Sequence, residues 1–312
     1  MNAQAPESIM MIRPSNFGYN PLTAQSNAFQ VSDIDATPQE ISRIAQNEFD
    51  HFHDLLSKAN IDTIIFDDAE GSALPDSVFP NNWISFHHNG TVVLYPMMAE
   101  NRRLERRMDI LPALQNRFDF HIERILDYTN HEVDGQYLEG TGSVVFDYVN
   151  KIAYANRSPR TDETVFVKLC SDLEYKGLLF DAIDPSGIDI YHTNVMMCVG
   201  SSFVVICLEA IPDEAMRLKL LHSFEETGHE IIDINFRQLN HFAGNVIEVL
   251  NRNKESVIVM SESAHDSLSN DQAKRLSKFG DLLSVPIPEI EKYGGGSTRC
   301  MIAGIYLPKL SK

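Results

Sequence analysis

Hydrophobic and polar positions follow two periods along the chain, and each period predicts one kind of element. Short apolar runs rich in Val, Ile and Phe, bounded by Gly, Asn, Asp or Ser, are typical of β-strands. Such runs predict strands at residues 61–66, 91–94, 143–146, 151–155, 194–199, 203–207, 246–250 and 257–260. The chain is therefore expected to contain many short strands.

Between these runs, apolar residues recur at the spacing of one helix face. They predict helices at residues 37–56, 101–117, 161–173, 212–227 and 269–279. The first of these has a well-defined beginning. Thr37 is placed to act as the N-cap, Pro38 is the first helical residue and Glu40 closes a capping box.

Pairs of predicted strands alternate with single helices over the whole length. The rhythm repeats roughly five times without a residue-level repeat, and no linker, low-complexity tract or charge block interrupts it. We predict one α/β domain over residues 1–312, built from pseudo-repeats. A doubly wound parallel sheet would show longer apolar strands and a Gly-rich first turn, and the sequence has neither.

The charge of the chain argues against two classes of partner. The 312 residues carry a formal net charge of −18, from 44 acidic and 26 basic residues. Such an excess disfavours binding to nucleic-acid phosphates or to an anionic membrane surface. We interpret it as a property that favours solubility.

Four cysteines are scattered along the chain, without a C-x-x-C pair or the spacing of a zinc site. Cys198 and Cys207 lie in apolar runs, as buried cysteines usually do. Residues 1–11 lack the pattern of a signal peptide, and no apolar run has the length of a membrane span. We therefore expect a cytoplasmic protein with free thiols.

The segment of residues 293–301, YGGGSTRCM, is the first candidate for chemistry. Three consecutive glycines indicate a backbone with positive φ or a close approach to a ligand. Cys300 follows this loop directly, and Arg299 beside it offers a cation that favours a thiolate. The alternative is a flexible turn with a buried cysteine, and the loop alone leaves both open.

A nucleophilic thiol needs an acid/base partner, and eleven histidines compete for that role. His192 differs from the others because it stands at the start of the predicted strand 194–199. Eight others, among them His87 and His229, lie in polar segments and are interpreted as surface residues. A structural role for His192 stays the alternative.

Two further segments contain polar residues next to predicted strands. Glu139 opens a Gly-rich turn before the strand 143–146, where a carboxylate can hold an imidazole in one tautomer. Residues 76–83, DSVFPNNW, contain the only tryptophan and two amides. The alternatives are a solvated glutamate and a capped turn.

In this order, the four motifs resemble the guanidino-group-modifying, amidinotransferase-like superfamily. They are F-x-x-N at residues 79–82, E-G-x-G at 139–142, H-x-N at 192–194 and G-G-G-x-x-R-C at 294–300. The resemblance runs from Phe79 to the C-terminus, and residues 11–15 look like the superfamily's first strand. The motif sequences are most similar to those of the bacterial citrulline hydrolase-type branch.

The resemblance implies a five-bladed α/β propeller of ββαβ units. It also implies that Cys300 is the nucleophile, His192 the general acid/base and Glu139 its orienting partner. The thiolate would attack a guanidino or ureido carbon, and His192 would protonate the departing nitrogen. Water would then open the covalent intermediate, with no metal or organic cofactor.

Two positions depart from the deiminases that the chain resembles. Those enzymes commonly have aspartates where this chain has Asn82 and Asn194, and carboxylates pair well with a cationic guanidinium. An amide offers both a donor and an acceptor, which suits a neutral ureido group. We therefore expect citrulline to be converted to ornithine, carbon dioxide and ammonia. Many relatives have the motif E-G-G-D where this chain has E-G-T-G at residues 139–142. Any role of the final aspartate of that motif is therefore absent here.

Recognition of an amino-acid substrate requires further groups. By resemblance, Arg160 is the first choice to bind the α-carboxylate, with Arg13, Arg157 and Arg299 as competitors, and Asn245 is expected to line the pocket. An amino acid is the only partner expected, and a homodimer stays open.

Three other functions stay open at this point. An arginine or methylarginine deiminase-type hydrolase and an amidinotransferase would keep the same Cys-His-Glu set. A non-catalytic binding relative is the alternative from another class. A metal-dependent hydrolase built on the histidine pairs 51/53 or 87/88 lacks carboxylate partners at ligand spacing.

Overall fold

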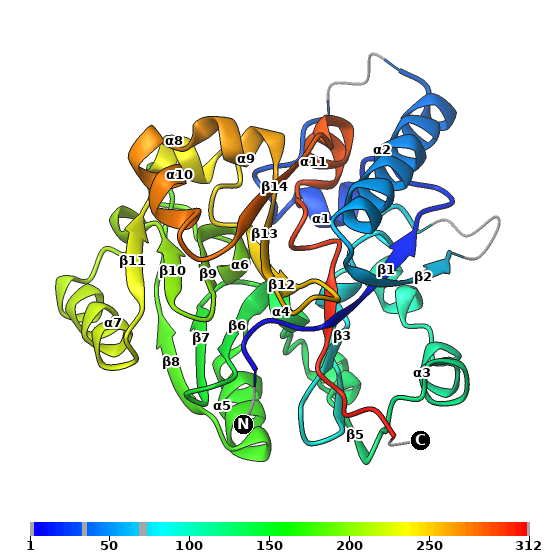
Figure 1. The fold of residues 1–312 in the computed structure, drawn as a ribbon, viewed down its shortest axis with the longest axis horizontal. Helices are drawn as coiled ribbons and strands as arrows, with labels where there is room; N and C mark the ends of the chain where they lie inside the picture. Colours follow the sequence, from blue (N-terminus) through cyan, green and yellow to red (C-terminus); the bar gives the residue numbers. More distant parts are fainter. Residues whose placement is uncertain (1–2, 33–35, 69–73, 311–312) are drawn as a thin grey trace.

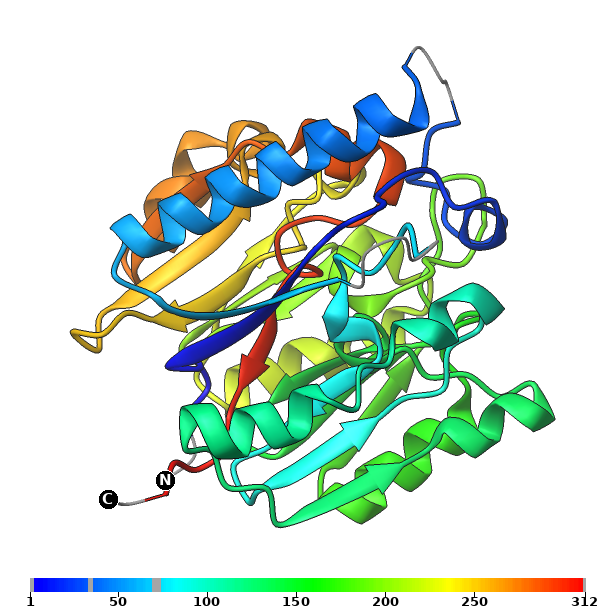
Figure 2. The ribbon, with the colours of Figure 1, turned by 90° about the vertical axis from the view of Figure 1, so that its right-hand side faces the viewer.

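The computed structural model describes residues 3–32, 36–68 and 74–310, and this part of the chain contains five three-stranded sheets (Figures 1 and 2). In each sheet an antiparallel pair is followed by a third strand that runs parallel to the second, with helix between them. The α/β class and the alternation of strand pairs and helices are confirmed. The closure of the five sheets into a propeller stays a prediction.

Four of the sheets follow one another along the chain. The first contains β3 (Ile84–Phe86), β4 (Thr91–Leu94), α3 (Ile110–Phe118) and β5 (Arg124–Asp127); the second contains β6 (Val144–Asp147), β7 (Ile152–Asn156), α5 (Glu163–Leu173) and β8 (Lys176–Phe180). The third contains β9 (Met197–Val199), β10 (Phe203–Ile206), α7 (Glu214–Glu226) and β11 (Glu230–Asp233). The fourth contains β12 (Ile247–Leu250), β13 (Ser256–Ser261), α9 (Glu262–Ser267), α10 (Asn270–Leu276) and β14 (Asp281–Val285).

The fifth sheet joins the two ends of the chain. It contains β15 (Ala303–Ile305), β1 (Ser8–Arg13) and β2 (Asp62–Asp67), with α2 (Pro38–Lys58) between β1 and β2. The blue β1 and the red C-terminal strand lie side by side in Figure 1, and Ile9 pairs with Gly304. Because β15 follows Cys300 closely, this pairing fixes the end of the loop that carries the thiol.

Helix α2 shows how an amphipathic segment covers a sheet. Its predicted capping box is confirmed: Thr37 and Glu40 exchange hydrogen bonds, and Pro38 is the first helical residue. Phe49 and Phe52 are fully buried in the cluster beneath it. Burying one such side chain contributes about 1.5–3 kcal/mol, so this face holds α2 in place.

Short helical turns connect these elements. They are α1 (Pro21–Ala24), η1 (Pro80–Asn82), η2 (Glu100–Glu105), η3 (Thr129–Asp134), α4 (Gly140–Ser143), α6 (Thr193–Met196), η4 (Leu208–Ala210), α8 (Phe236–Leu239) and α11 (Pro288–Gly294). None of the helices in the described residues is long and apolar enough to cross a membrane.

Two predicted elements differ from the structure. The helix over 101–117 is divided into η2 and α3, because the chain becomes extended at Arg106. In the strand over 194–199 only Met197–Val199 is extended. The residues before it form α6, whose Thr193 hydroxyl donates to the carbonyl of Ser143.

The surface placement predicted for His87 and His229 is wrong, because both side chains are buried. His87 packs edge-on against Phe146, and its Nε2 lies 2.9 Å from the hydroxyl of Ser85. Burial lowers the pKa of His87 to about 3. A polar sequence context therefore did not indicate exposure here.

Candidate active site

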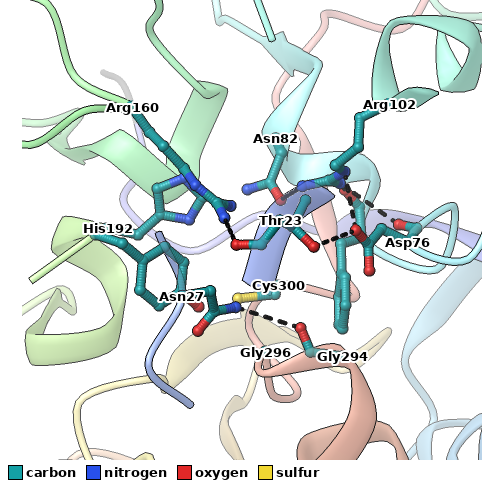
Figure 3. A pocket seen from close by; sticks show the side chains of 12 residues that line it. Thr23, Asn27, Asp76, Asn82, Arg102, Arg160, His192, Gly294, Gly296 and Cys300 are labelled. Carbon is teal, nitrogen blue, oxygen red and sulfur yellow. Dashed lines mark hydrogen bonds and ion pairs between the residues drawn. The ribbon is translucent and has the colours of Figure 1, made fainter. Parts of the chain in front are cut away.

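The predicted motifs meet at one pocket. Its wall is made of Thr23, Asn27, Asp76, Phe79, Asn82, Arg102, Arg160, Tyr191, His192, Gly294, Gly296 and Cys300. Figure 3 shows His192 and Arg160 on one side of Cys300, and Arg102 and Asp76 on the other. The structure thus brings residues from both ends of the chain to one cavity.

Cys300 is held in a tight turn and is almost fully buried. Gly295 ends α11 with a φ of 60°, which favours glycine, and the backbone N–H of Cys300 then donates to the carbonyl of Ser297. The sulfur receives hydrogen bonds from Asn194 Nδ2 at 3.3 Å and Asn245 Nδ2 at 3.2 Å. The sulfur therefore has two donors aimed at it.

The cation expected from Arg299 is not beside the thiol. Its Nη1 donates to the carbonyl of Ile302, and its side chain lines a different cavity. The other competitors for the carboxylate also lie outside the pocket wall: Arg13 pairs with Asp50, and Arg157 pairs with Glu163 and Asp181.

Beside the thiol, His192 and Glu139 form a buried pair. His192 Nε2 lies 2.9 Å from Glu139 Oε2, and Glu139 Oε1 accepts the N–H of Met98 at 3.0 Å. The other ring nitrogen of His192, Nδ1, is then available for chemistry. Burial lowers the pKa of His192 to about 4, although Glu139 pulls it upward.

Glu139 is ionised in spite of its complete burial. Burial alone would raise its pKa, but the charge of Arg160 and the hydrogen bond with His192 hold the pKa well below its usual range. A permanent carboxylate behind His192 favours the imidazolium that forms during proton transfer. The arrangement therefore matches an acid/base pair with its orienting group.

Gly142 lies between His192 and the amide of Asn82. A Cβ at this position would lie 2.5 Å from Asn82 Nδ2 and 2.7 Å from His192 Nδ1, closer than real contacts. The glycine in the E-G-T-G motif thus allows these two nitrogens to approach the same point. An aspartate there would have to displace both of them.

Near the sulfur, two amide atoms have no hydrogen-bond partner among the described residues. Asn82 Oδ1 accepts from Arg102 Nη1 at 2.9 Å, which leaves Asn82 Nδ2 as an unpaired donor. Asn194 donates its Nδ2 to the sulfur, which leaves its Oδ1 as an unpaired acceptor. Asn82 lines the pocket, and Asn194 contacts the sulfur that lines it. Buried polar atoms rarely lack partners, so both are candidates for contact with a ligand.

Away from the sulfur, the pocket wall is charged. Arg102 binds Glu105 through two parallel hydrogen bonds of 2.9 Å and lies 3.7 Å from Asp76. Asp76 Oδ2 accepts from Asn20 at 2.7 Å, whereas Oδ1 has no partner among the described residues. Burial raises the pKa of Asp76 and raises that of Glu105 to about 7, against the pull of Arg102.

Arg160 lines the pocket, as the sequence predicts, and each of its three guanidinium nitrogens has one partner. Nε donates to the hydroxyl of Ser26 at 2.9 Å, Nη2 to the carbonyl of Thr23 at 2.7 Å, and Nη1 lies 3.4 Å from Glu139. Its guanidinium also lies 4.9 Å from the ring centroid of Tyr191. Arg160 therefore links the carboxylate of Glu139 to the segment that covers the pocket.

This cover is formed by residues 20–31, which the sequence did not predict as part of the site. Asn27 and Gln30 donate to the carbonyl of Gly294, and Asn27 also donates to that of Gly295. These bonds hold the cover against the loop that carries Cys300.

Sequence reasoning missed Asp76 and Arg102. Asp76 begins the segment of residues 76–83, in which only the two amides and the tryptophan were considered. Arg102 lies in a predicted helix, where arginines are usually exposed. The signal that links them is their pairing with each other in one part of the pocket wall, and it exists only in three dimensions. Within the described ranges, no three His, Cys, Asp or Glu side chains are grouped as metal ligands.

Comparisons with known proteins agree with this geometry. A family model described as "N,N dimethylarginine dimethylhydrolase, eukaryotic" matches residues 13–307. No curated protein sequence matches the chain at a significant level.

Several solved structures share the fold. ArgZ, an arginine dihydrolase from the ornithine–ammonia cycle in cyanobacteria, gives a TM-score of 0.72 at 17% identity, over 97% of this chain and 41% of ArgZ. AgrE in complex with L-arginine gives 0.70 at 16%, over 98% of this chain and 41% of AgrE. A dimethylarginine dimethylaminohydrolase adduct with S-methyl-L-thiocitrulline gives 0.64 at 15%, over 96% and 99%. The chain thus spans less than half of ArgZ or AgrE.

Proposed function

The chain belongs to the N,N dimethylarginine dimethylhydrolase family, and from this premise we propose that it is a cysteine-dependent hydrolase of the ureido or guanidino carbon of a free amino acid. The family lies within the guanidino-modifying, amidinotransferase-like superfamily that the motifs resemble, and that resemblance is confirmed. The family and its structural neighbours are hydrolases acting on guanidino C–N bonds. The arrangement of Cys300, His192 and Glu139 supports the same chemistry here.

In the proposed reaction, Cys300 attacks the planar carbon while its proton passes to His192 Nδ1. His192 then gives this proton to the departing nitrogen, and ammonia leaves. The product of this step is a thiocarbamate on Cys300. Water, deprotonated by His192, opens it and restores the thiol, and the carbamate that is released breaks down to ornithine and carbon dioxide.

Citrulline is the substrate that the pocket favours. The observation that carries this choice is the pair of unpaired atoms near the sulfur: a donor on Asn82 and an acceptor on Asn194. A ureido group presents one carbonyl acceptor and one NH₂ donor, and so it satisfies both. A guanidinium has only donors, so the N–H of Asn82 would remain without an acceptor.

The charged end of the pocket suits the head group of an amino acid. Asp76 Oδ1 is the unpaired acceptor there, and we propose that it binds the α-ammonium. Arg160 remains our choice for the α-carboxylate, with Arg102 as the neighbouring cation. The cover over the pocket suits a free amino acid rather than an arginine within a protein.

Arginine is the second candidate, and the net charge of the buried groups favours it. Three carboxylates, on Asp76, Glu105 and Glu139, face two guanidinium groups, on Arg102 and Arg160. The excess negative charge would be compensated by a cationic substrate. The raised pKa of Glu105 reduces this excess, because it favours the protonated form.

A substrate screen tests the proposal. The purified protein is incubated with citrulline, arginine, agmatine and methylated arginines, and ornithine, citrulline and ammonia are measured, with Cys300→Ala as the control. Ornithine and ammonia from citrulline are expected, and Cys300→Ala is expected to form neither. Turnover of arginine alone would replace the ureido assignment by the deiminase-type one. If no substrate is converted, the hydrolase proposal fails.

A further inference from the structure

Two side-chain amides hold the sulfur of Cys300, and both present nitrogen to it. Asn245 Nδ2 lies 3.2 Å from Sγ and Asn194 Nδ2 lies 3.3 Å from it. An amide nitrogen donates and does not accept, so the sulfur has to be the acceptor in both bonds. A thiolate is a much stronger acceptor than a thiol, because hydrogen bonds to an ionised group are stronger. The geometry is therefore that of a thiolate site.

The amide of Asn245 cannot turn its oxygen toward the sulfur. Its Oδ1 accepts the backbone N–H of Arg299 at 3.1 Å, and its Nδ2 also donates to the carbonyl of Asn194 at 2.9 Å. If the amide were flipped, its NH₂ group would face the N–H of Arg299 and its oxygen would face the carbonyl oxygen of Asn194. The side chain is also fully buried, so this orientation is fixed by its surroundings.

The backbone before Asn245 is equally fixed. Gly244 packs against α6, where an added Cβ would lie 2.5 Å from the carbonyl of Val195. The N–H of Asn245 donates to the carbonyl of Phe242 at 2.8 Å. The segment that carries Asn245 is thus locked to the segment that carries His192 and Asn194.

The titratable groups around the sulfur do not replace these amides. His192 is neutral near pH 7, because burial lowers its pKa to about 4. Arg299 lies in another cavity. The pocket wall also contains Tyr191, Arg102, Arg160 and Asp76, and both arginines are engaged with carboxylates or carbonyls. Side-chain amides are the donors that the structure places on the sulfur.

We propose that Asn245 is a catalytic residue that stabilises the Cys300 thiolate, with Asn194 as the second donor. The inference rests on the proposed role of Cys300 as the nucleophile and assigns Asn245 a role at the sulfur rather than on the substrate. When the thiol ionises during turnover its proton passes to His192 Nδ1, and the amides then hold the negative sulfur. No further reactant is involved.

The remaining cysteines provide an internal comparison. Burial raises the pKa of Cys170, Cys198 and Cys207 to about 12, with only weak or no compensation by hydrogen bonds. At neutral pH an alkylating agent should therefore react with Cys300 well before it reacts with the other three.

Alkylation by iodoacetamide tests the proposal without any substrate. The rate at Cys300 is followed by peptide mass spectrometry from pH 5 to 10 in the wild type, Asn245→Ala, Asn245→Asp and Asn251→Ala. Asn251 is a buried amide at the far end of β12, and its variant serves as the matched control. Asn245→Leu, which has a similar shape but no hydrogen-bond donor, replaces the alanine variant if that one does not fold.

The expected result is a rise of about one pH unit in the alkylation midpoint for Asn245→Ala, or about a tenfold lower rate at pH 7. Asn245→Asp should show a larger rise, because it sets an oxygen against the sulfur, and Asn251→Ala should match the wild type. A wild-type profile in both Asn245 variants overturns the inference alone. If Cys300 of the wild type reacts no faster than the other three cysteines, the proposed nucleophile fails as well.

Discussion

The two ends of the pocket are built from different kinds of side chain. Around the sulfur, neutral amides from Asn82, Asn194 and Asn245 lie beside the His192–Glu139 pair. At the other end, Arg102 and Asp76 form part of a buried network of charges. This difference is the basis of our proposal that a charged head group binds at one end and a neutral carbon reacts at the other.

The two ends also differ in how well their atoms are satisfied. Arg102 has partners for both edges of its guanidinium, which offsets the large cost of burying a charge. The amide end instead leaves one donor and one acceptor unpaired. At the charged end only Asp76 Oδ1 lacks a partner among the described residues, so both ends keep unpaired atoms that a ligand can satisfy.

The largest effect is expected at the sulfur. Cys300→Ala should lower kcat by at least roughly 10⁴-fold, because the covalent route is lost. Cys170→Ala removes a thiol on α5, outside the pocket wall, and should leave kcat within about twofold of the wild type. Steady-state ornithine release measures both variants. Comparable losses in the two would mean that the thiol chemistry is not located at Cys300.

A smaller effect is expected for Glu139→Gln, which keeps the shape of the side chain and removes its charge. The imidazolium of His192 then loses its partner, and kcat should fall about 10²–10⁴-fold. Glu163→Gln changes an exposed carboxylate on α5 and is the control. Rates are measured with citrulline, and circular dichroism checks the fold. Retained activity in Glu139→Gln would contradict the assigned pair.

Asn82→Asp tests the contrast between the two ends of the pocket directly, because it introduces a carboxylate at the end that contains the sulfur. The substitution removes the donor and adds a carboxylate that suits a guanidinium, so the ratio of kcat/KM for arginine to that for citrulline should rise about 10–100-fold. Asn89→Asp, in the turn between β3 and β4, should leave the ratio unchanged. An unchanged ratio in Asn82→Asp would remove the basis of the citrulline assignment.

Asp76→Asn acts at the charged end and should change binding rather than chemistry. Loss of the carboxylate that we assign to the α-ammonium should raise KM about tenfold and leave kcat within about threefold. Initial rates over a range of citrulline concentrations separate the two constants. A loss confined to kcat would place Asp76 in the chemical step instead.

The smallest effect concerns stability and pH. The pKa of Glu105 is raised from 4.5 in the unfolded chain to about 7 in the fold, so the folded state binds more protons between these values. Its contribution to stability is therefore present at pH 4.5 and is lost as the pH rises through 7. Glu105→Gln should reduce the fall in unfolding free energy over this window by at least about 1 kcal/mol. Urea unfolding at several pH values measures it, and identical pH dependence in both proteins would contradict the raised pKa.

Local features of the site were predictable from the sequence. The Gly-rich loop before Cys300, the position of His192 ahead of a strand and the turn at Glu139 are all properties of neighbouring residues. Their order along the chain then indicated the superfamily. The capping box of α2 was predictable for the same reason, because Thr37 and Glu40 satisfy each other within one turn.

Features that depend on distant contacts were not predictable. Arg299 follows the glycine loop, yet its side chain lines another cavity together with distant residues such as Gln4 and Tyr148. Asp76 and Arg102 show their role only when the chain brings them together with Asn20. Short edge strands such as β5, which is largely exposed, carry little apolar pattern to reveal them.

The covalent intermediate offers the most direct test of the account. Wild-type protein is mixed with citrulline, quenched in acid during turnover and digested, and the peptide that contains Cys300 is analysed by mass spectrometry, with an arginine reaction run in parallel. We expect an adduct on Cys300 with the mass of citrulline less one ammonia, and none when Asn82→Asp is mixed with citrulline under the same conditions. A wild-type adduct with arginine but none with citrulline would contradict a site built for a neutral ureido group.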